Sequence, residues 1–163
     1  MIFKPFIKLH RITDISAELL VRHNISGLIL DIDNTLSTHH GLELLPGLRE
    51  WIVKMQNSGI SLLILSNSKE KRVKPFAENL GLGYLSLGMK PLPHGYIKAA
   101  KKMGLKRKNT AIVGDQLFTD SLGGHISGVK PIITDPIERE NLASFKVRRK
   151  LEDFLYKFYK FEV

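Results

Sequence analysis

The sequence predicts a single three-layer α/β domain, in which a five-stranded, mainly parallel sheet carries helices on both faces. Its 163 residues match the usual size of one domain. Short apolar runs alternate with longer stretches whose apolar residues recur at helical spacing, a pattern typical of parallel sheets. No repeat, low-complexity tract or linker divides the chain, so we expect residues 1–163 to form one domain.

Five short apolar runs predict the strands of this sheet. Runs of four to six mainly apolar residues are typical of strands that helices cover on both faces. The predicted strands span residues 27–32, 60–65, 84–87, 110–113 and 131–134.

Six segments around these runs predict helices. Asp14 is a candidate cap, Pro46 is a candidate first residue, and Pro75 should kink its helix or delay its start. The predicted helices begin near Asp14 and Pro46 and then span about residues 69–80, 93–103, 119–126 and 141–158.

The last predicted helix carries an apolar stripe at helical spacing, which we expect to pack onto the sheet. The stripe consists of Val147, Leu151, Phe154, Leu155 and Phe158. Basic and aromatic residues are mixed in this segment and in the first eight residues, a composition that suits the surface of an anionic membrane. The two interpretations are compatible, because the outer face of this helix could contact lipid while the inner stripe packs onto the sheet.

Composition limits the classes of function. The chain has 25 Lys and Arg against 16 Asp and Glu, a formal charge of +9, which favours anionic partners. It has no cysteine, which excludes disulfides and thiolate metal sites. No apolar run reaches the roughly 18 residues that cross a bilayer, and the first residues do not fit a secretory signal. We expect a cytoplasmic protein, with peripheral contact at a membrane left open; the sequence does not give the oligomeric state.

Polar side chains follow the predicted strands at the point where each strand ends. Asp31 and Asp33 end the first run, Ser66 and Asn67 follow the second, and Lys90 follows the third. Asp115 and Asp120 follow the fourth run. The carboxyl ends of parallel strands meet at one edge of the sheet, so we expect these side chains to lie together.

These residue types suit phosphoryl transfer. Asp31 and Asp33 point to the same side of an extended chain, and their mutual repulsion calls for a cation. With Asp115 they form an all-oxygen set of metal ligands that suits Mg²⁺. Lys90 adds a positive charge for phosphoryl oxygens, and Ser66 and the amides near Asn67 form a candidate anion site.

The ordered motifs resemble those of the haloacid dehalogenase (HAD) phosphatases, subfamily III. That superfamily has Asp-x-Asp-x-Thr after its first strand, then a Ser or Thr, a Lys, and a Gly-Asp-x4-Asp type element. The matching residues are Asp31-Ile-Asp33-Asn-Thr35, Ser66, Lys90 and Gly114-Asp115 with Asp120. Within the superfamily, the chain is similar to the small YqeG-type group, which is related to mitochondrial phosphatidylglycerophosphate phosphatase. The resemblance implies a Rossmann-like HAD fold.

The resemblance also implies a role for each residue. Asp31 would attack phosphorus and become an aspartyl phosphate, while Asp33 would act as general acid and then general base. Mg²⁺ would bind Asp31, Asp115 and the backbone carbonyl of Asp33. Ser66 and Lys90 would hold the phosphoryl group, and Asp120 would orient Lys90 or a metal-bound water.

The spacing of the motifs predicts an open site without a cap domain. Nine residues separate Leu36 from Pro46, and about two dozen separate Ser66 from Lys90, too few for an inserted domain. An open site admits a large or surface-bound phosphorylated substrate. His39 and His40 follow the first motif, either as substrate contacts or as an exposed loop.

Three functions remain after these arguments. The favoured one is a phosphatase for a membrane phospholipid, with phosphatidylglycerophosphate as the expected substrate. The second is the same chemistry on a nucleic-acid end, a phosphoprotein or a soluble phosphometabolite. The third is a non-catalytic basic module that binds nucleic acid, which is not favoured because the chain has no nucleic-acid motif.

Overall fold

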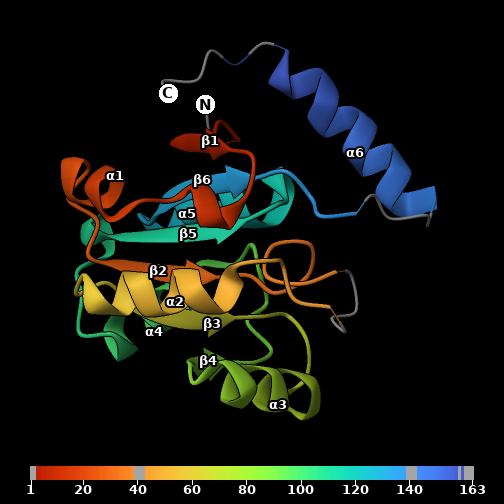
Figure 1. Cartoon of the computed structure of the whole chain (residues 1–163). Coiled ribbons are helices and arrows are strands. Elements are labelled where there is room, and N and C mark those ends of the chain that lie inside the picture. Colours follow the sequence, from red (N-terminus) through yellow and green to blue (C-terminus); the bar gives the residue numbers. More distant parts are fainter. Residues whose placement is uncertain (1–2, 39–42, 139–142, 158, 160–163) are drawn as a thin grey trace.

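A computed structural model describes residues 3–38, 43–138, 143–157 and 159, and shows a six-stranded, fully parallel sheet (Figure 1). Its strands lie in the order β1-β6-β5-β2-β3-β4. Their bounds are β1 Ile7–Leu9, β2 Gly27–Leu30, β3 Ser61–Leu65, β4 Gly83–Leu85, β5 Thr110–Gly114 and β6 Lys130–Thr134. The α/β class and the five predicted strands are confirmed, whereas the total of five strands is wrong.

The missed strand is β1, which pairs with β6 at the edge of the sheet through Ile7 and Ile132. It has three residues in a segment interrupted by Lys and Pro, so it lacks the apolar run that marks the other strands. The predicted third strand extends two residues too far. Leu87 has a φ of 49°, a left-handed conformation that a strand residue does not adopt.

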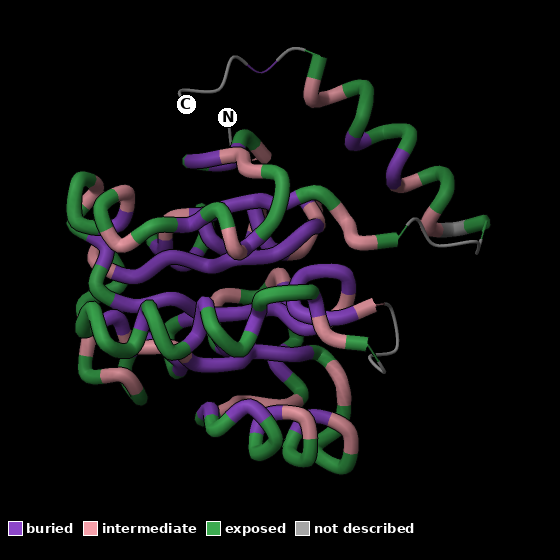
Figure 2. Tube along the Cα trace, viewed as in Figure 1, coloured by how far each residue is buried: buried purple, intermediate pink, exposed green. Residues whose placement is uncertain are grey.

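Side chains of the central strand β2 alternate between two apolar cores. Leu28 and Leu30 belong to one core, and Ile29 belongs to the other, on the opposite face of the sheet. All three are fully buried, and each side chain contributes about 1.5–3 kcal/mol to folding. Figure 2 shows the consequence, a sheet that is buried along its central strands and helices that are exposed on their outer sides.

Helices cover both faces of the sheet, as predicted. On one face lie α1 (Ala17–Arg22), α2 (Leu48–Asn57) and α3 (Glu70–Leu80), which contribute Leu20, Trp51 and Val73 to the larger core. On the other face lie α4 (Pro93–Lys102) and α5 (Leu122–Ser127). Glycines let α5 pack closely there, because a Cβ on Gly123 would lie 2.2 Å from the hydroxyl oxygen of Tyr96.

Helix starts differ from the predictions by a few residues. Ser16, not Asp14, caps α1, since its Oγ accepts a hydrogen bond from the amide of Leu19 at 3.1 Å. Asp14 instead ends a short 3₁₀ helix, η1 (Ile12–Asp14). α2 begins two residues after Pro46, and α3 begins at Glu70 and contains Pro75, so the proline does not delay its start. A second 3₁₀ helix, η2 (Arg107–Asn109), precedes β5.

The segment after β5 is irregular where one short helix was predicted. A π-helix, η3 (Leu117–Ser121), leads directly into α5. This widened turn carries Asp120 back toward the end of β5.

The last helix, α6 (Ala143–Tyr156), lies outside the two helix layers, beyond β1 and β6 (Figure 1). The prediction that its apolar stripe packs onto the sheet is wrong for three residues: Val147, Leu151 and Phe154 are 68%, 48% and 55% exposed. The buried face instead contains Arg149 and Glu152, because this helix is anchored by hydrogen bonds to polar groups. Of the remaining stripe, Leu155 packs against a small core of Leu117, Ile133 and Tyr159, and Phe158 lies outside the described residues.

No helix among the described residues is long and apolar enough to cross a membrane. The segments after β2 and β3 lead directly to α2 and α3, with no inserted cap domain among the residues described there.

Candidate active site

The predicted residues meet at the carboxyl end of the sheet because β2 lies between β3 and β5. Five of them, Asp31, Asp33, Ser66, Asn67 and Lys90, line a pocket of about 480 Å³, whereas Asp115 lines a smaller cavity of about 240 Å³. A larger hollow of about 790 Å³ is lined by α4, α5 and the loop before β5, and its lining includes no carboxylate. The pocket that brings Asp31 together with Ser66 and Lys90 is therefore the candidate active site.

Lys90 joins two carboxylates at the bottom of this pocket. Its Nζ donates to Asp31 Oδ1 at 2.7 Å and to Asp120 Oδ1 at 2.9 Å. The lysine side chain is 4% exposed. Burial alone would lower the pKa of Lys90, but Asp120 and Asp31 outweigh that effect and hold the pKa above its ordinary value. Lys90 is a permanent cation beside the candidate nucleophile.

The two central aspartates resist ionisation. Burial raises the pKa of Asp31 to about 7, and Asp120 and Asp33 add to this effect while Lys90 opposes it. Burial also raises the pKa of Asp115 well above its ordinary value, against the opposing charge of Arg149. Binding of a further cation would stabilise the ionised form of these buried carboxylates.

The acidic cluster fits a divalent metal ion. Asp31, Asp115 and Asp120 each offer an oxygen, and these oxygens lie within 4.8 Å of one another. Asp115 Oδ1 is buried and has no hydrogen-bond partner among the described residues. Such an all-oxygen set suits Mg²⁺. The carboxylate of Asp33 is not part of this cluster, which leaves its backbone carbonyl as the ligand that the motif implies.

Asp33 is held by an arginine that the sequence prediction missed. Arg72, on α3, donates from Nη1 to Asp33 Oδ2 at 3.0 Å and from Nη2 to Asp33 Oδ1 at 2.5 Å. Nη1 also contacts Ser68 Oγ at 2.9 Å. This two-point contact fixes the plane of the carboxylate. The sequence offered one unused signal: Arg72 lies within the first turn of the helix that follows the Ser-Asn-Ser motif.

Ser66 and Asn67 reach the pocket in different ways. Ser66 is buried, and its Oγ accepts a hydrogen bond from the Ser68 amide at 3.1 Å. Asn67 forms two hydrogen bonds with the backbone of Lys90. Its Oδ1 accepts from the Lys90 amide at 2.7 Å, and its Nδ2 donates to the Lys90 carbonyl at 3.2 Å. The Asn67 side chain therefore positions the lysine loop.

Asp115 has an arginine partner from the far end of the chain. Arg149, on α6, donates from Nη2 to Asp115 Oδ2 and from Nη1 to the Asp115 carbonyl at 2.9 Å and to Glu152 Oε2 at 2.9 Å. Glu152 in turn accepts a hydrogen bond from the Leu117 amide at 2.9 Å. No sequence signal separated Arg149 from the other basic residues of its helix.

Asp120 occupies space that only glycine leaves open. A Cβ on Gly114 would lie 2.1 Å from Asp120 Oδ2, so the Gly-Asp motif requires a glycine. Asp120 Oδ2 accepts from the Gln116 amide at 3.2 Å, while Oδ1 holds Lys90. Of its two implied roles, the structure shows the contact with Lys90. His39 and His40 lie outside the described residues.

Comparison with known proteins identifies the family. Residues 17–128, more than half of the chain, match the family described as haloacid dehalogenase-like hydrolase. The chain belongs to this family. The sequence prediction of a HAD-type phosphatase is thereby confirmed at the level of the enzyme class.

Two relatives refine the placement of this HAD hydrolase. It is 35% identical over 150 residues to the probable phosphatase YqeG of Bacillus subtilis (strain 168), covering 92% of this chain and 87% of that protein. It is 27% identical over 164 residues to phosphatidylglycerophosphate phosphatase 1, chloroplastic/mitochondrial, of Arabidopsis thaliana. That match covers 94% of this chain and 47% of the plant protein. The predicted YqeG-type resemblance is confirmed.

A solved structure supports the fold of this HAD hydrolase. The putative HAD superfamily (subfamily III A) hydrolase from Legionella pneumophila superposes with a TM-score of 0.52 at 20% identity. The match covers 86% of this chain and 93% of that chain. It confirms the Rossmann-like HAD architecture predicted from the motifs.

Proposed function

We propose that this chain is a Mg²⁺-dependent phosphomonoester hydrolase that works through an aspartyl phosphate on Asp31. The observation that carries the proposal is the contact of Lys90 Nζ with Asp31 Oδ1 at 2.7 Å, beside a cluster of three buried aspartates. A carboxylate nucleophile at an anionic phosphate needs positive charge on both sides. Lys90 would provide it on one side, and a metal ion held by the aspartates would provide it on the other.

The reaction has two steps with one residue as acid and base. Asp31 attacks phosphorus, and the P–O bond to the alcohol breaks as Asp33 donates a proton to the leaving oxygen. Water then attacks the phosphoryl group, Asp33 takes its proton, and the bond between phosphorus and the Asp31 oxygen breaks. Asp33 carries the proton on the oxygen that it releases from Arg72, while Arg72 keeps the other oxygen in place. Ser66 and Lys90 hold the phosphoryl oxygens.

The metal would bind Asp31, Asp115 and the Asp33 carbonyl. When bound, Mg²⁺ screens the repulsion between the ionised nucleophile and the phosphate dianion. The chain's own residues prepare this site, since Arg149 neutralises part of the charge on Asp115 and leaves its Oδ1 for the ion.

For the substrate we propose a phosphorylated membrane lipid, phosphatidylglycerophosphate. The similarity to the plant protein of that name supports it, as does an open site without a cap. The exposed apolar residues Val147 and Leu151 on α6 lie beside the exposed Lys146 and Lys150, which suits contact with an anionic membrane. A nucleic-acid end, a phosphoprotein or a soluble phosphometabolite would use the same chemistry.

The test is phosphate release with Mg²⁺ from phenyl phosphate and from phosphatidylglycerophosphate in mixed micelles. The native chain is compared with Asp31→Asn and with Glu18→Gln, a matched loss of one exposed carboxylate on α1. We expect Asp31→Asn to lower the rate at least about 1,000-fold, because the nucleophile is lost, and Glu18→Gln to have no effect. Activity that survives in Asp31→Asn would refute the mechanism, and activity on phenyl phosphate alone would refute the lipid substrate.

A further inference from the structure

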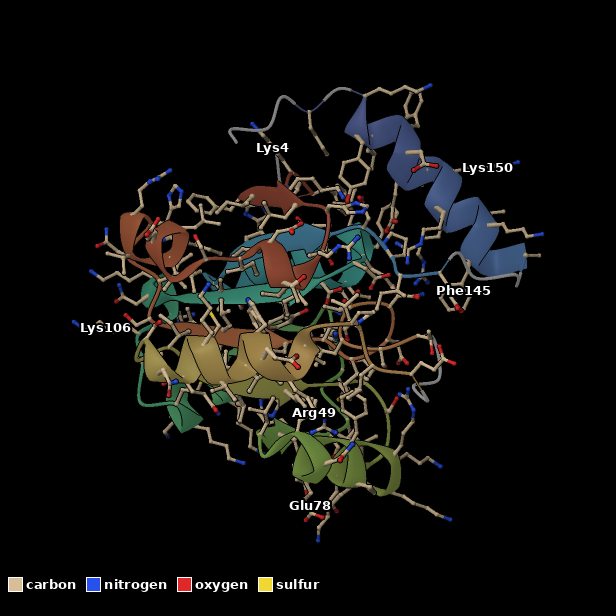
Figure 3. All side chains as sticks on the ribbon, in the orientation of Figure 1. Lys4, Arg49, Glu78, Lys106, Phe145 and Lys150 are labelled. Atoms are coloured by element: carbon tan, nitrogen blue, oxygen red, sulfur yellow. The ribbon has the colours of Figure 1, made fainter. Side chains whose placement is uncertain are left out.

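One wall of the active-site pocket is built by α6 and by the loop after β5. Phe145 and Arg148 come from α6, Gln116 comes from the loop after β5, and Phe118 and Thr119 come from η3. Figure 3 shows Phe145 at the end of α6 that lies nearest the strand ends. The last helix therefore contributes to the pocket directly.

Arg148 is held at this wall in a defined position. Its Nη1 donates to Gln116 Oε1 at 2.8 Å, and its guanidinium carbon lies 5.5 Å from the centre of the Phe145 ring. The residue is half-buried. Contact with an amide and an aromatic ring orients a guanidinium without neutralising its charge.

The helix itself is fixed next to the site. Arg149, the following residue, bonds both the carbonyl and the carboxylate of Asp115, and Glu152 bonds the amide of Leu117. These buried contacts hold α6 against the loop after β5. Arg148 is thus placed by a rigid element, as a recognition residue requires.

Lys90, the other cation that lines the pocket, is already bound to Asp31 and Asp120. Arg72, on α3 and outside the lining of this pocket, is bound to Asp33. Arg148 differs, because the hydrogen bond described for it goes to the neutral side chain of Gln116, and the nearby Glu152 is bonded to Arg149 and to the Leu117 amide. Its charge can therefore be used by an incoming anion.

Topology separates Arg148 from the phosphoryl site. Ser66 and Asn67 follow β3, whereas Gln116 and the α6 wall lie on the β5 side, and β2 with Asp31 runs between them. A phosphoryl group held by Ser66 and Lys90 would direct its alcohol part away from Asp31. Phe118 and Phe145 provide apolar surface for that part.

We infer that Arg148 is a specificity residue that binds a second anionic group on the alcohol part of the substrate. This inference rests on the proposed function and deepens it. The substrate class is a phosphomonoester whose alcohol carries another anion, such as a phosphodiester. Both an intact lipid headgroup and its free, deacylated form have this chemistry.

The test compares Arg148→Gln and Arg148→Lys with Lys54→Gln. Lys54 lies on α2 and is exposed, so its loss removes the same charge outside the pocket and outside α6. The substrates are phenyl phosphate, short-chain phosphatidylglycerophosphate below its micelle concentration, and the deacylated headgroup of that lipid. Phenyl phosphate has no second anion.

We expect Arg148→Gln to lower kcat/KM at least about 10-fold for both two-anion substrates, mainly through KM, because a charge-assisted hydrogen bond is lost. Phenyl phosphate should change less than about two-fold, and Arg148→Lys should recover part of the loss. Equal effects on all three substrates, or none, would overturn the inference while leaving the phosphatase function intact. A lower kcat/KM for the lipid alone would also overturn the inference, since Arg148 would then recognise the acyl chains and not the second anion.

A binding measurement decides the matter independently of turnover. Titration calorimetry of the deacylated headgroup into Asp31→Asn, with and without Arg148→Gln, should show at least about a 10-fold weaker affinity in the double variant. Equal affinities would refute the role of Arg148. If the native chain released no phosphate from any substrate, the proposed function would fail, and this comparison would still decide the role of Arg148.

Discussion

The two carboxylate oxygens of Asp115 differ in their partners. Its Oδ2 accepts from Arg149, and its Oδ1 has no partner among the described residues. The side chain of Asp115 is completely buried and that of Arg149 is 7% exposed, so water screens neither charge well. The ion pair therefore matters for folding as well as for metal binding.

Replacement of Arg149 by Gln should destabilise the metal-free chain by about 3 kcal/mol or more, because a buried carboxylate loses its partner. Mg²⁺ should restore part of that loss, since the ion supplies the missing positive charge. Urea unfolding with and without Mg²⁺ measures both effects, and Lys150→Gln is the control on the same helix. A loss of the same size in both conditions would show that Arg149 serves helix packing alone.

Arg72 acts on the candidate acid–base residue and leaves the metal ligands untouched. Its two hydrogen bonds to Asp33 restrict the rotation of that carboxylate. We expect Arg72→Gln to lower kcat on phenyl phosphate about 10-fold with little change in the Mg²⁺ concentration needed for half activity. Arg72→Lys should recover part of the rate, and Lys71→Gln, at the exposed neighbouring position, should have none of these effects. A lower Mg²⁺ affinity in Arg72→Gln would contradict this role.

At the scale of elements, α6 differs most from its sequence prediction. Apolar residues at helical spacing predict a buried face, and the rule holds when the partner surface is apolar. Here the partner surface contains Asp115 and the Leu117 amide, so the helix buries Arg149 and Glu152 toward it. The apolar residues at positions 147, 151 and 154 consequently lie on the outside. Sequence alone could not reveal which polar groups this helix would meet.

The outer face of α6 should bind anionic membranes. We expect the chain to float with vesicles of phosphatidylglycerol and not of phosphatidylcholine at low salt, and to dissociate at high salt. Val147→Glu combined with Leu151→Glu should abolish flotation, because charge replaces the apolar contact. Val21→Glu is the control, since Val21 is 71% exposed on the distant helix α1. Equal flotation of both variants would refute a membrane contact through α6.

The central elements were predictable because their signals are local. β2, β3 and β5 are short apolar runs, and each is followed by the polar residue that the chemistry needs. The positions of Asp31, Ser66 and Asp115 follow from parallel pairing alone. Arg72 and Arg149 could not be placed in the same way, because their partners lie 39 and 34 residues away in the sequence.

For the whole molecule, the acidic cluster couples stability to pH and to metal. The pKa of Asp31 is raised from 3.8 to about 7 in the folded chain, so the folded state holds a proton that the unfolded state releases. Between these two values the folded state binds more protons, and the free energy of unfolding therefore falls as pH rises. Burial of Asp115 acts in the same direction.

Metal-free protein should accordingly be less stable at pH 8 than at pH 5, through the contribution of this cluster. Mg²⁺ should bind with release of protons and remove most of the loss at pH 8, because it stabilises the ionised carboxylates. Thermal unfolding across this pH range, with Mg²⁺ or with a chelator, measures the effect. Asp31→Asn should flatten the pH dependence, and an unchanged slope in that variant would assign the effect to other groups.

The contact between α6 and the loop after β5 has a consequence for the order in which the enzyme becomes complete during synthesis. The six strands emerge from the ribosome before the helix does, and domains begin to fold as they emerge. Until Arg149 arrives, the nascent sheet holds Asp115 without its partner and lacks one wall of the pocket. A partly made chain therefore already contains Asp31 but lacks both the partner of Asp115 and the α6 wall of the pocket.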